Sequence, residues 1–239
     1  MIDYAADHEK VYYSRSITVK DLIQKYIEQY DVTKMTQLEG ETEAEFNARK
    51  ALALKLTELV KSLATYGSAA QVYFGYRNDE STLVDKSYLT TLKDINVPEL
   101  ADYVVQWTGV EGKELFKYYG QTFSCKSNTM IRYAFKMLSG TQVTDYTVDF
   151  NGPATMNTYI DKSGSYVIVN VSNIAAANID EKFEFTVKCK DEVLGTLNGA
   201  AMNYVKAVCD TPSDPEELKN LAKAIYNYNT CANVFFAQN

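Results

Sequence analysis

The segment Leu63-Ala-Thr-Tyr-Gly-Ser-Ala-Ala-Gln-Val-Tyr-Phe-Gly-Tyr-Arg77 has a counterpart at the other end of the chain, Ile225-Tyr-Asn-Tyr-Asn-Thr-Cys-Ala-Asn-Val-Phe-Phe-Ala-Gln-Asn239. Aligned without a gap, the two copies match at apolar positions that recur every three or four residues, which is the period of one helix face. The matched pairs are Leu56 and Leu218, Leu59 and Leu221, Leu63 and Ile225, Tyr66 and Tyr228, Ala70 and Ala232, and Tyr73 and Phe235. The copies therefore share the packing face of a repeated helix.

Each of these long helices has a start signal of its own and a shorter helix before it. Thr42-Glu-Ala-Glu45 is a capping box, in which the Thr hydroxyl and the Glu carboxylate each accept a bond from an otherwise unpaired backbone N–H. Asp214-Pro-Glu-Glu217 places Asp at the N-cap and Pro at the first helical position. Because the apolar stripe runs unbroken past Gly67, the first long helix is expected to be continuous. With short helices expected at 21–31 and 199–209, the sequence predicts a helical hairpin that occurs twice.

Between the two hairpins, from about residue 81 to residue 197, the apolar period changes to two. Alternation is clear in Ile131–Met137, Tyr146–Phe150 and Phe183–Cys189, and Tyr166–Val171 is a fuller apolar run. The turn dipeptides between these runs are Asn151-Gly152, Ser163-Gly164 and Lys190-Asp191. About seven or eight antiparallel strands are predicted, which is typical of a β-sandwich. The expected fold class is therefore α+β, an antiparallel β-sandwich with two repeated helical hairpins.

Composition and charge exclude several classes of function. The chain has 239 residues, 46% of them apolar, which is enough for one large core or two smaller ones. It has no apolar run of about 18 residues, the length that crosses a bilayer. The net charge is −7, whereas nucleic-acid binding draws its affinity from a basic surface that releases counterions. We therefore expect no nucleic-acid partner and no membrane insertion.

Signatures of metals, cofactors and catalysis are also missing from the sequence. The one histidine is His8, and the four cysteines have no metal-ligand spacing, so we expect no metal and no cofactor. In an antiparallel hairpin Cys209 and Cys231 are too far apart to bond, so buried free thiols are favoured over a disulfide framework. The G-x-S-x-G, H-E-x-x-H and phosphate-loop motifs are absent. We expect no enzyme, although the 31 acidic residues leave the carboxylate pair of a glycosidase open.

The segment from residue 103 to residue 119 is the best candidate for ligand binding. It holds the only Trp of a chain that also has 19 Tyr and 10 Phe. An exposed ring at a sheet edge can stack on the C–H face of a sugar while polar neighbours bond the hydroxyls. We predict the ligand-binding residues Trp107, Tyr118, Tyr119, Tyr103 and Lys113, with Gln106 and Glu114 as further hydroxyl partners. Core packing is the alternative for Trp107, and alternation along a strand lets only one of Tyr118 and Tyr119 face outward.

Several segments together resemble a module of large secreted proteins from gut-type Gram-positive anaerobic bacteria. These segments are Leu59–Tyr76, Ser16–Leu22, Gly120–Met130, Tyr166–Ala177 and Phe183–Val187. In that family a β-sandwich is followed by a helical hairpin, and the modules stand beside dockerin, Ig-like or repeat domains. The resemblance covers most of the chain, and its motifs are structural. It implies an extracellular or cell-surface location and carries over no catalytic residue.

The resemblance also implies a division of the chain. Residues 1–80 are expected to be a terminal strand, at Val11–Ser16, and a hairpin that is either the tail of a preceding module or packed on the next one. Residues 81–197 are expected to form the sandwich, and residues 198–239 a second hairpin packed on it. Other modules of the same protein are then possible partners.

Two functions of different class follow from these observations. The first is non-catalytic binding of a polysaccharide, such as the glucans starch or cellulose, by a module of a multi-domain surface protein. The second is a structural spacer, or a protein-interaction or adhesin module, with no glycan binding. The spacer function predicts that Trp107 and most Tyr rings pack inside, whereas glycan binding predicts that some of these rings are exposed.

Overall fold

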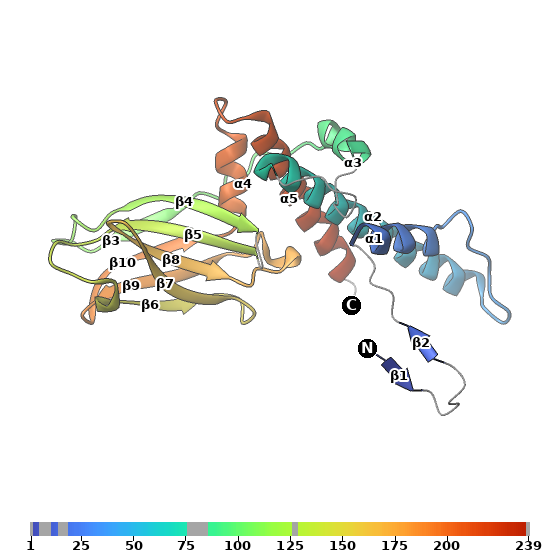
Figure 1. Cartoon of the computed structure of the whole chain (residues 1–239), viewed down its shortest axis with the longest axis horizontal. Coiled ribbons are helices and arrows are strands. Elements are labelled where there is room, and N and C mark those ends of the chain that lie inside the picture. The colour runs from blue at the N-terminus through green and yellow to red at the C-terminus, as the bar shows by residue number, and fades with distance from the viewer. Residues whose placement is uncertain (1, 5–10, 14–18, 76–85, 126–128, 238–239) are drawn as a thin grey trace.

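The computed structural model describes residues 2–4, 11–13, 19–75, 86–125 and 129–237. Within these residues the fold is α+β, with five α-helices and two antiparallel four-stranded sheets (Figure 1). The helices are α1 (Val19–Gln29), α2 (Glu43–Phe74), α3 (Lys86–Thr90), α4 (Met202–Cys209) and α5 (Glu216–Phe236). The strands of the two sheets are β3 (Gln106–Gly109), β4 (Tyr118–Cys125), β5 (Thr129–Lys136), β6 (Tyr146–Asn151), β7 (Asn157–Ser163), β8 (Tyr166–Ser172), β9 (Phe183–Cys189) and β10 (Glu192–Gly199).

The strands form two sheets of different order. One sheet has the order β3-β10-β9-β6 and the other the order β4-β5-β8-β7, and every pairing in both is antiparallel. Predicted turns close two of the hairpins with positive φ angles, 58° at Gly164 and 48° and 68° at Lys190 and Asp191. A further short pair, β1 (Ile2–Tyr4) with β2 (Val11–Tyr13), lies apart from both sheets, and residues 14–16 of the predicted strand lie outside the described residues.

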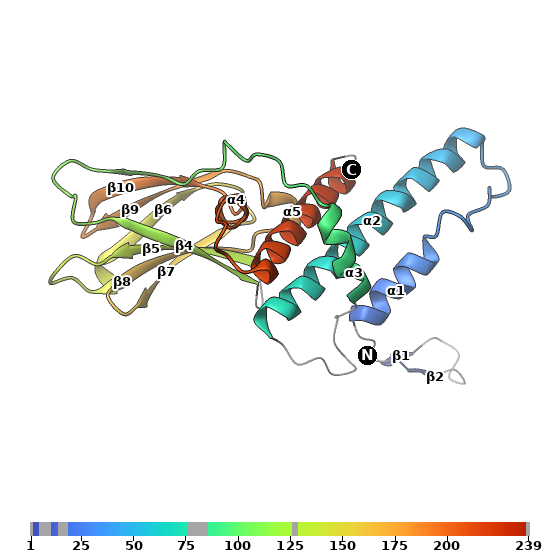
Figure 2. The ribbon, with the colours of Figure 1, turned by 90° about the horizontal axis from the view of Figure 1, so that it is seen from above.

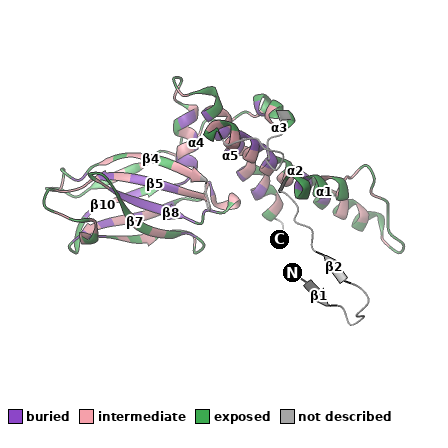
Figure 3. Cartoon of the chain, in the orientation of Figure 1, coloured by how far each residue is buried: buried purple, intermediate pink, exposed green. Residues whose placement is uncertain are grey.

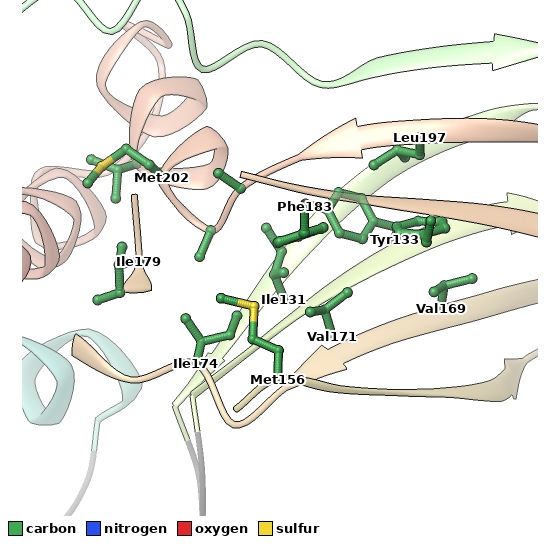
Figure 4. Packing of buried hydrophobic residues seen from close by; sticks show 14 of the residues in the cluster. Ile131, Tyr133, Met156, Val169, Val171, Ile174, Ile179, Phe183, Leu197 and Met202 are labelled. Atoms are coloured by element: carbon green, nitrogen blue, oxygen red, sulfur yellow. The ribbon is translucent and has the colours of Figure 1, made fainter. Parts of the chain in front are cut away.

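Side chains from both sheets meet in one core. The ring of Phe135 on β5 lies 6.2 Å from that of Phe185 on β9, and Tyr133 lies 5.4 Å from the same Phe185 ring. Figure 4 shows Tyr133 beside Phe183 and Leu197, which come from the opposite sheet. Figure 3 shows buried residues along the strands and along α5, and mainly exposed ones on α1. Period-two alternation therefore produces its expected result, a buried face on each sheet.

The long helix α2 begins where its sequence predicts and is continuous past Gly67, as expected. The Glu45 N–H donates to the Thr42 hydroxyl at 3.3 Å, and the Thr42 N–H donates to the Glu45 carboxylate at 2.8 Å, which completes the capping box. The helix continues through Gly67 and stops at Gly75, whose φ of 63° is left-handed. The predicted Asp214 cap is wrong. Helix α5 begins at Glu216, and its N-cap is Pro215, whose side chain has no oxygen to accept a cap bond. The N–H of Asp214 donates to the carbonyl of Thr211 in the turn before the helix.

Helices α2 and α5 pack against each other in opposite directions (Figure 2). Their contact includes Tyr66 and Tyr228, whose rings are 5.7 Å apart and 6° from parallel. These two residues occupy the same position in the two copies of the sequence repeat. At this pair a matched position of one helix packs on that of the other, as in a two-fold contact between identical subunits. The fully buried residues of α2 are small side chains at other positions, namely Ala53, Thr57, Ser62, Ala64, Thr65, Ser68 and Ala69.

Helix α5 is also tied to the strand region. Asn229, which aligns with Gly67, donates one amide hydrogen to the carbonyl of Ala176 at 2.8 Å and one to Asp180 at 2.9 Å. Asn233 donates to the second oxygen of Asp180 at 2.9 Å. These bonds hold the C-terminal helix against the short 3-10 turn Ala176–Asn178.

Strands begin later along the chain than the sequence predicts. Residues 86–94, within the expected strand region, form α3 and a 3-10 helix (Thr91–Asp94). Leu89 and Leu92 lie three residues apart, which places both on one helical face against the core. In a segment as short as residues 86–94, the spacing of the apolar residues alone does not distinguish a helix from a strand.

Two further expectations concern cysteines and membranes. Cys189, Cys209 and Cys231 are free thiols in the structure, and the side chain of Cys125 lies outside what is described. Among the described residues, no helix is both long and apolar enough to cross a membrane.

Candidate functional site

Trp107 packs toward the interior of the sheet pair. It lies opposite Leu197 on β10, and its ring is 4.8 Å from Phe135 and 5.9 Å from Phe116. A Cβ added to Gly195 would lie 2.4 Å from the indole, so glycine at that position makes room for the ring. Trp107 is thus a packing residue, and we remove it from the predicted set of sugar contacts.

Tyr118 and Tyr119 face opposite sides of their strand, as alternation requires. Tyr118 points inward, 5.9 Å from Phe135 and 6.3 Å from Tyr133, and burial raises the pKa of its hydroxyl to about 12. The side chain of Tyr119 points outward and is 59% exposed. Of this pair, only Tyr119 is available to a ligand.

Lys113 lies in the loop between β3 and β4. Its ammonium is 2.6 Å from the Glu192 carboxylate at the start of β10. Glu114 in the same loop accepts the backbone N–H of Gly112 at 2.7 Å. Neither side chain lines the cleft of Tyr103 or the hollow of Tyr119.

Tyr103 lines a polar cleft of about 520 Å³ on the outer face of the β3-β10-β9-β6 sheet. The cleft contains one side chain from each of the four strands, and each lies directly opposite its neighbour in the register. In strand order these side chains are Gln106, Asn198, Glu184 and Asn151. They face away from the core because the next position on each strand faces into it. The inward-facing residues are Trp107, Leu197, Phe185 and Phe150.

This row of polar side chains spans the full width of the sheet. Adjacent strands are about 4.8 Å apart, so three amides and one carboxylate follow one another at that spacing. Each amide offers two donors and an acceptor, and the carboxylate offers acceptors only. The row can therefore bond several neighbouring hydroxyl groups of one ligand.

Tyr103 and Lys182 form one wall of the cleft. The Lys182 ammonium lies 5.7 Å from the centre of the Tyr103 ring. Burial, and then the charges of Asp180 and Asp102, raise the pKa of the Tyr103 hydroxyl. The ring thus remains a neutral phenol that can donate a hydrogen bond.

Asn203 forms the back of the cleft and is only 3% exposed. Its side-chain oxygen accepts the backbone N–H of Ala200, and its side-chain nitrogen has no partner among the described residues. A Cβ on neighbouring Gly199 would lie 2.7 Å from the Tyr133 hydroxyl and 3.3 Å from the Asn203 oxygen. Glycine at that position therefore leaves room for the Tyr133 hydroxyl in the core behind the cleft.

Charge restricts what the cleft can accept. Its ionisable lining consists of three carboxylates, Asp102, Glu181 and Glu184, and the one ammonium of Lys182. An anionic ligand is therefore repelled, whereas neutral hydroxyl groups are not. In the described part of the chain, no group of three or more His, Cys, Asp or Glu side chains is arranged to hold a metal ion.

Sequence reasoning identified Tyr103 and Gln106 but missed most of the row. Glu184 and Asn198 stand at polar positions of alternating strands, so period two shows that they face outward. The alternation does not show that Glu184 and Asn198 lie beside Gln106. That placement depends on the register between strands that are far apart in the sequence.

The structure therefore divides the predicted contacts among three environments. Trp107 and Tyr118 are partly buried against the core, Lys113 is in a loop, and Tyr103 and Tyr119 lie on the outer faces of different sheets. Comparison with known proteins does not favour any of these environments. No family model, no curated protein and no solved structure matches the chain.

Proposed function

We propose that this chain is a non-catalytic module that binds a neutral polysaccharide in the Tyr103 cleft. The observation that supports the proposal most directly is the row of Gln106, Asn198, Glu184 and Asn151 beside an aromatic ring. Planar amides and carboxylates bond vicinal hydroxyls in pairs, and a ring can cover the apolar face of the same sugar. The volume of about 520 Å³ falls in the range of small-molecule sites.

The preferred ligand of this cleft is a glucan such as starch or cellulose. The carboxylates in the lining disfavour uronates, sulfated sugars and phosphorylated polymers. Asn203 adds a buried donor at the back of the cleft, where it could bond a hydroxyl that the row does not reach. No step of bond cleavage is part of the proposal.

The proposal includes an architecture and a setting. We take the two sheets as a β-sandwich, and the helix pairs α1–α2 and α4–α5 as two copies of one hairpin. Rings that contact across the sheets and the stacking of Tyr66 on Tyr228 support this architecture. By the resemblance of its segments to secreted bacterial modules, the chain acts outside the cell, within a multi-domain surface protein.

A spacer or protein-interaction module is the second candidate. The packing of Trp107 and Tyr118 inside the sheet pair favours it, since a rigid spacer needs its rings in the core. The two candidates differ in what they require of the cleft. A spacer makes no use of a polar row that crosses the whole sheet beside an amide nitrogen with no protein partner among the described residues.

Affinity electrophoresis through gels that contain soluble starch, β-glucan or xylan, together with pull-down on insoluble cellulose, tests the proposal. We expect retention by at least one glucan and its loss in Asn198→Ala and Tyr103→Ala. The matched control is Glu58→Gln, a change on the exposed face of α2 that leaves the cleft intact. If each protein migrates in every glycan gel as it does in a gel without glycan, and cellulose captures none of them, glycan binding at the cleft is eliminated and the spacer function is left.

A further inference from the structure

A second hollow, of about 350 Å³, lies on the outer face of the other sheet. Its floor consists of Gly120, Ala134 and Ile168, which lie opposite one another on β4, β5 and β8. Because two of these residues have almost no side chain, the sheet surface is depressed between taller neighbours. The side chains of Ala134 and Ile168 make this central part of the floor apolar.

Two tyrosine rings border this hollow. Tyr119 lies edge-on to Tyr166, with centroids 5.3 Å apart and planes at 70°. The ammonium of Lys136 lies 5.2 Å from the centre of the Tyr166 ring, and its nitrogen bonds the hydroxyl of Ser165 at 2.8 Å. Since Tyr119 is among the most exposed large side chains of the described residues, its face is open to a ligand.

Arg132 supplies a positive charge on the same floor. Its Nε donates to the side-chain oxygen of Asn170 at 3.1 Å. The buried Asn170 amide is itself oriented by bonds from its nitrogen to the carbonyls of Tyr159 and Ile168, both at 3.3 Å. An oriented neutral acceptor therefore holds one edge of the guanidinium without neutralising it.

The remaining edge of that guanidinium has no partner of opposite charge. Among the described residues, no carboxylate lies within 4.0 Å of Arg132, whereas Arg49 is bonded to Glu41 at 2.8 Å. A planar guanidinium that has donors free presents them in the geometry that matches a carboxylate. The hollow thus combines an open ring, an apolar floor and a carboxylate-binding group.

We propose that this hollow binds a hexuronate residue of an acidic polysaccharide. Its carboxylate is held by the free donors of Arg132, and the C–H face of its sugar ring lies against Tyr119. Lys136 adds a second positive charge at the rim. The site goes beyond the proposed function, because it lies on the other sheet and selects the charge that the Tyr103 cleft repels.

Isothermal titration with short oligogalacturonates tests this assignment in the full chain. The matched probe is the methyl ester of the same oligosaccharide, which keeps the sugar ring and removes the charge. We expect binding of the acid, and a loss of about tenfold or more in affinity on esterification or in Arg132→Gln. Arg132→Lys should recover only part of that loss, because an ammonium lacks the bidentate fork.

Two further variants separate the contributions of ring and charge. Tyr119→Ala changes an exposed side chain, so the variant should fold normally. Its affinity for the acidic oligosaccharide should nevertheless fall by about tenfold, because the stacking contact is lost. Lys162→Gln is the charge control. It lies opposite Val167, a core residue, and therefore faces the other side of the sheet from Arg132. It should bind as the unmodified chain does, and circular dichroism should show that every variant is folded at the temperature of the titration.

Three results would overturn the assignment. The first is no heat of binding with the acid, and the second is equal affinity for acid and ester. The third is that polyglutamate displaces the acidic sugar from the hollow at a similar concentration and that Tyr119→Ala leaves the affinity for polyglutamate unchanged. That result would make the hollow a site for an acidic peptide. Retention of neutral glucan by the cleft is measured separately and does not depend on any of these results.

Discussion

Gly195→Ala tests the packing role of Trp107. The new Cβ would lie 2.4 and 2.5 Å from two atoms of the indole six-membered ring, and 2.6 Å from the carbonyl oxygen of Thr108. Ordinary contacts between heavy atoms are about 3.5–4.0 Å, so the ring must move by about 1 Å or more. Phe116 and Phe135 lie against the other side of that ring and oppose the movement.

The expected cost can be bounded from these contacts. Overpacking a core costs about 1–3 kcal/mol, and a clash that includes a backbone oxygen belongs in the upper half of that range. Replacing Gly by Ala returns about 0.4–1 kcal/mol by restricting the unfolded chain. We expect a net loss of about 2 kcal/mol in the free energy of unfolding, or about 4–8 °C in Tm for a chain of this size.

Gly109→Ala is the matched control. Gly109 lies directly opposite Gly195, but a Cβ there meets the indole at an ordinary 3.4 Å. Urea unfolding followed by far-UV circular dichroism measures both variants and also Trp107→Phe, which removes the clashing ring atoms. Gly195→Ala should lower the free energy of unfolding less in a chain that carries Trp107→Phe than in the unmodified chain. The cost that is left should come from the clash with the carbonyl oxygen of Thr108. Equal stability of Gly195→Ala and Gly109→Ala would refute the reasoning.

Three other predictions follow from particular contacts. In a double-mutant cycle of Tyr66→Ala and Tyr228→Ala, chemical denaturation should give a coupling of about 0.5–1.5 kcal/mol, and a coupling of zero would contradict their stacking. Asn229→Ala should lose about 1–3 kcal/mol in the same assay, because the partly buried carbonyl of Ala176 and carboxylate of Asp180 both lose this donor; an unchanged midpoint would contradict this role. Arg49 lowers the pKa of Glu41 from 4.5 to about 2, so this pair stabilises the fold above pH 4.5 and ceases to do so as pH falls toward 2. In thermal melts from pH 6 to pH 2, the Tm values of the unmodified chain and of Arg49→Met should therefore converge at the acid end. A Tm difference that stays constant with pH would show that the ion pair does not cause the lower stability of the variant.

Much of the secondary structure could be predicted because its signals are local. Phe183–Cys189 alternates over its whole length, and the predicted bounds coincide with those of β9. The capping box at Thr42 fixes the start of α2 through bonds between residues only three apart. At the second long helix the same kind of signal places the cap one residue too early, at Asp214, whereas the N-cap is Pro215. Local signals therefore fix that a helix starts here more reliably than the residue at which it starts.

The binding surfaces could be predicted only in part, because they depend on register. Tyr103 and Tyr119 are 16 positions apart in the sequence and were predicted as one surface, but they lie on the outer faces of different sheets. Because side chains alternate between the two faces of a strand, the sequence showed that only one of Tyr118 and Tyr119 faces outward. It could not show that Arg132 and Ile168 lie in the same hollow as Tyr119, since that requires the pairing of β4, β5 and β8.

The net charge of the whole chain conceals a difference between the two outer faces. A chain with a net charge of −7 suggests a uniformly acidic surface, yet Arg132 and Lys136 stand on one face, and Glu184 with Glu181 stands on the other. The two sheets are about 10 Å apart through a packed core, so no side chain reaches both surfaces. A single sugar residue therefore cannot occupy both, and in the two proposals each surface selects its ligand by its own charge. If both bind as proposed, the chain holds a neutral and an acidic polysaccharide at once, and saturating one surface leaves the affinity of the other unchanged.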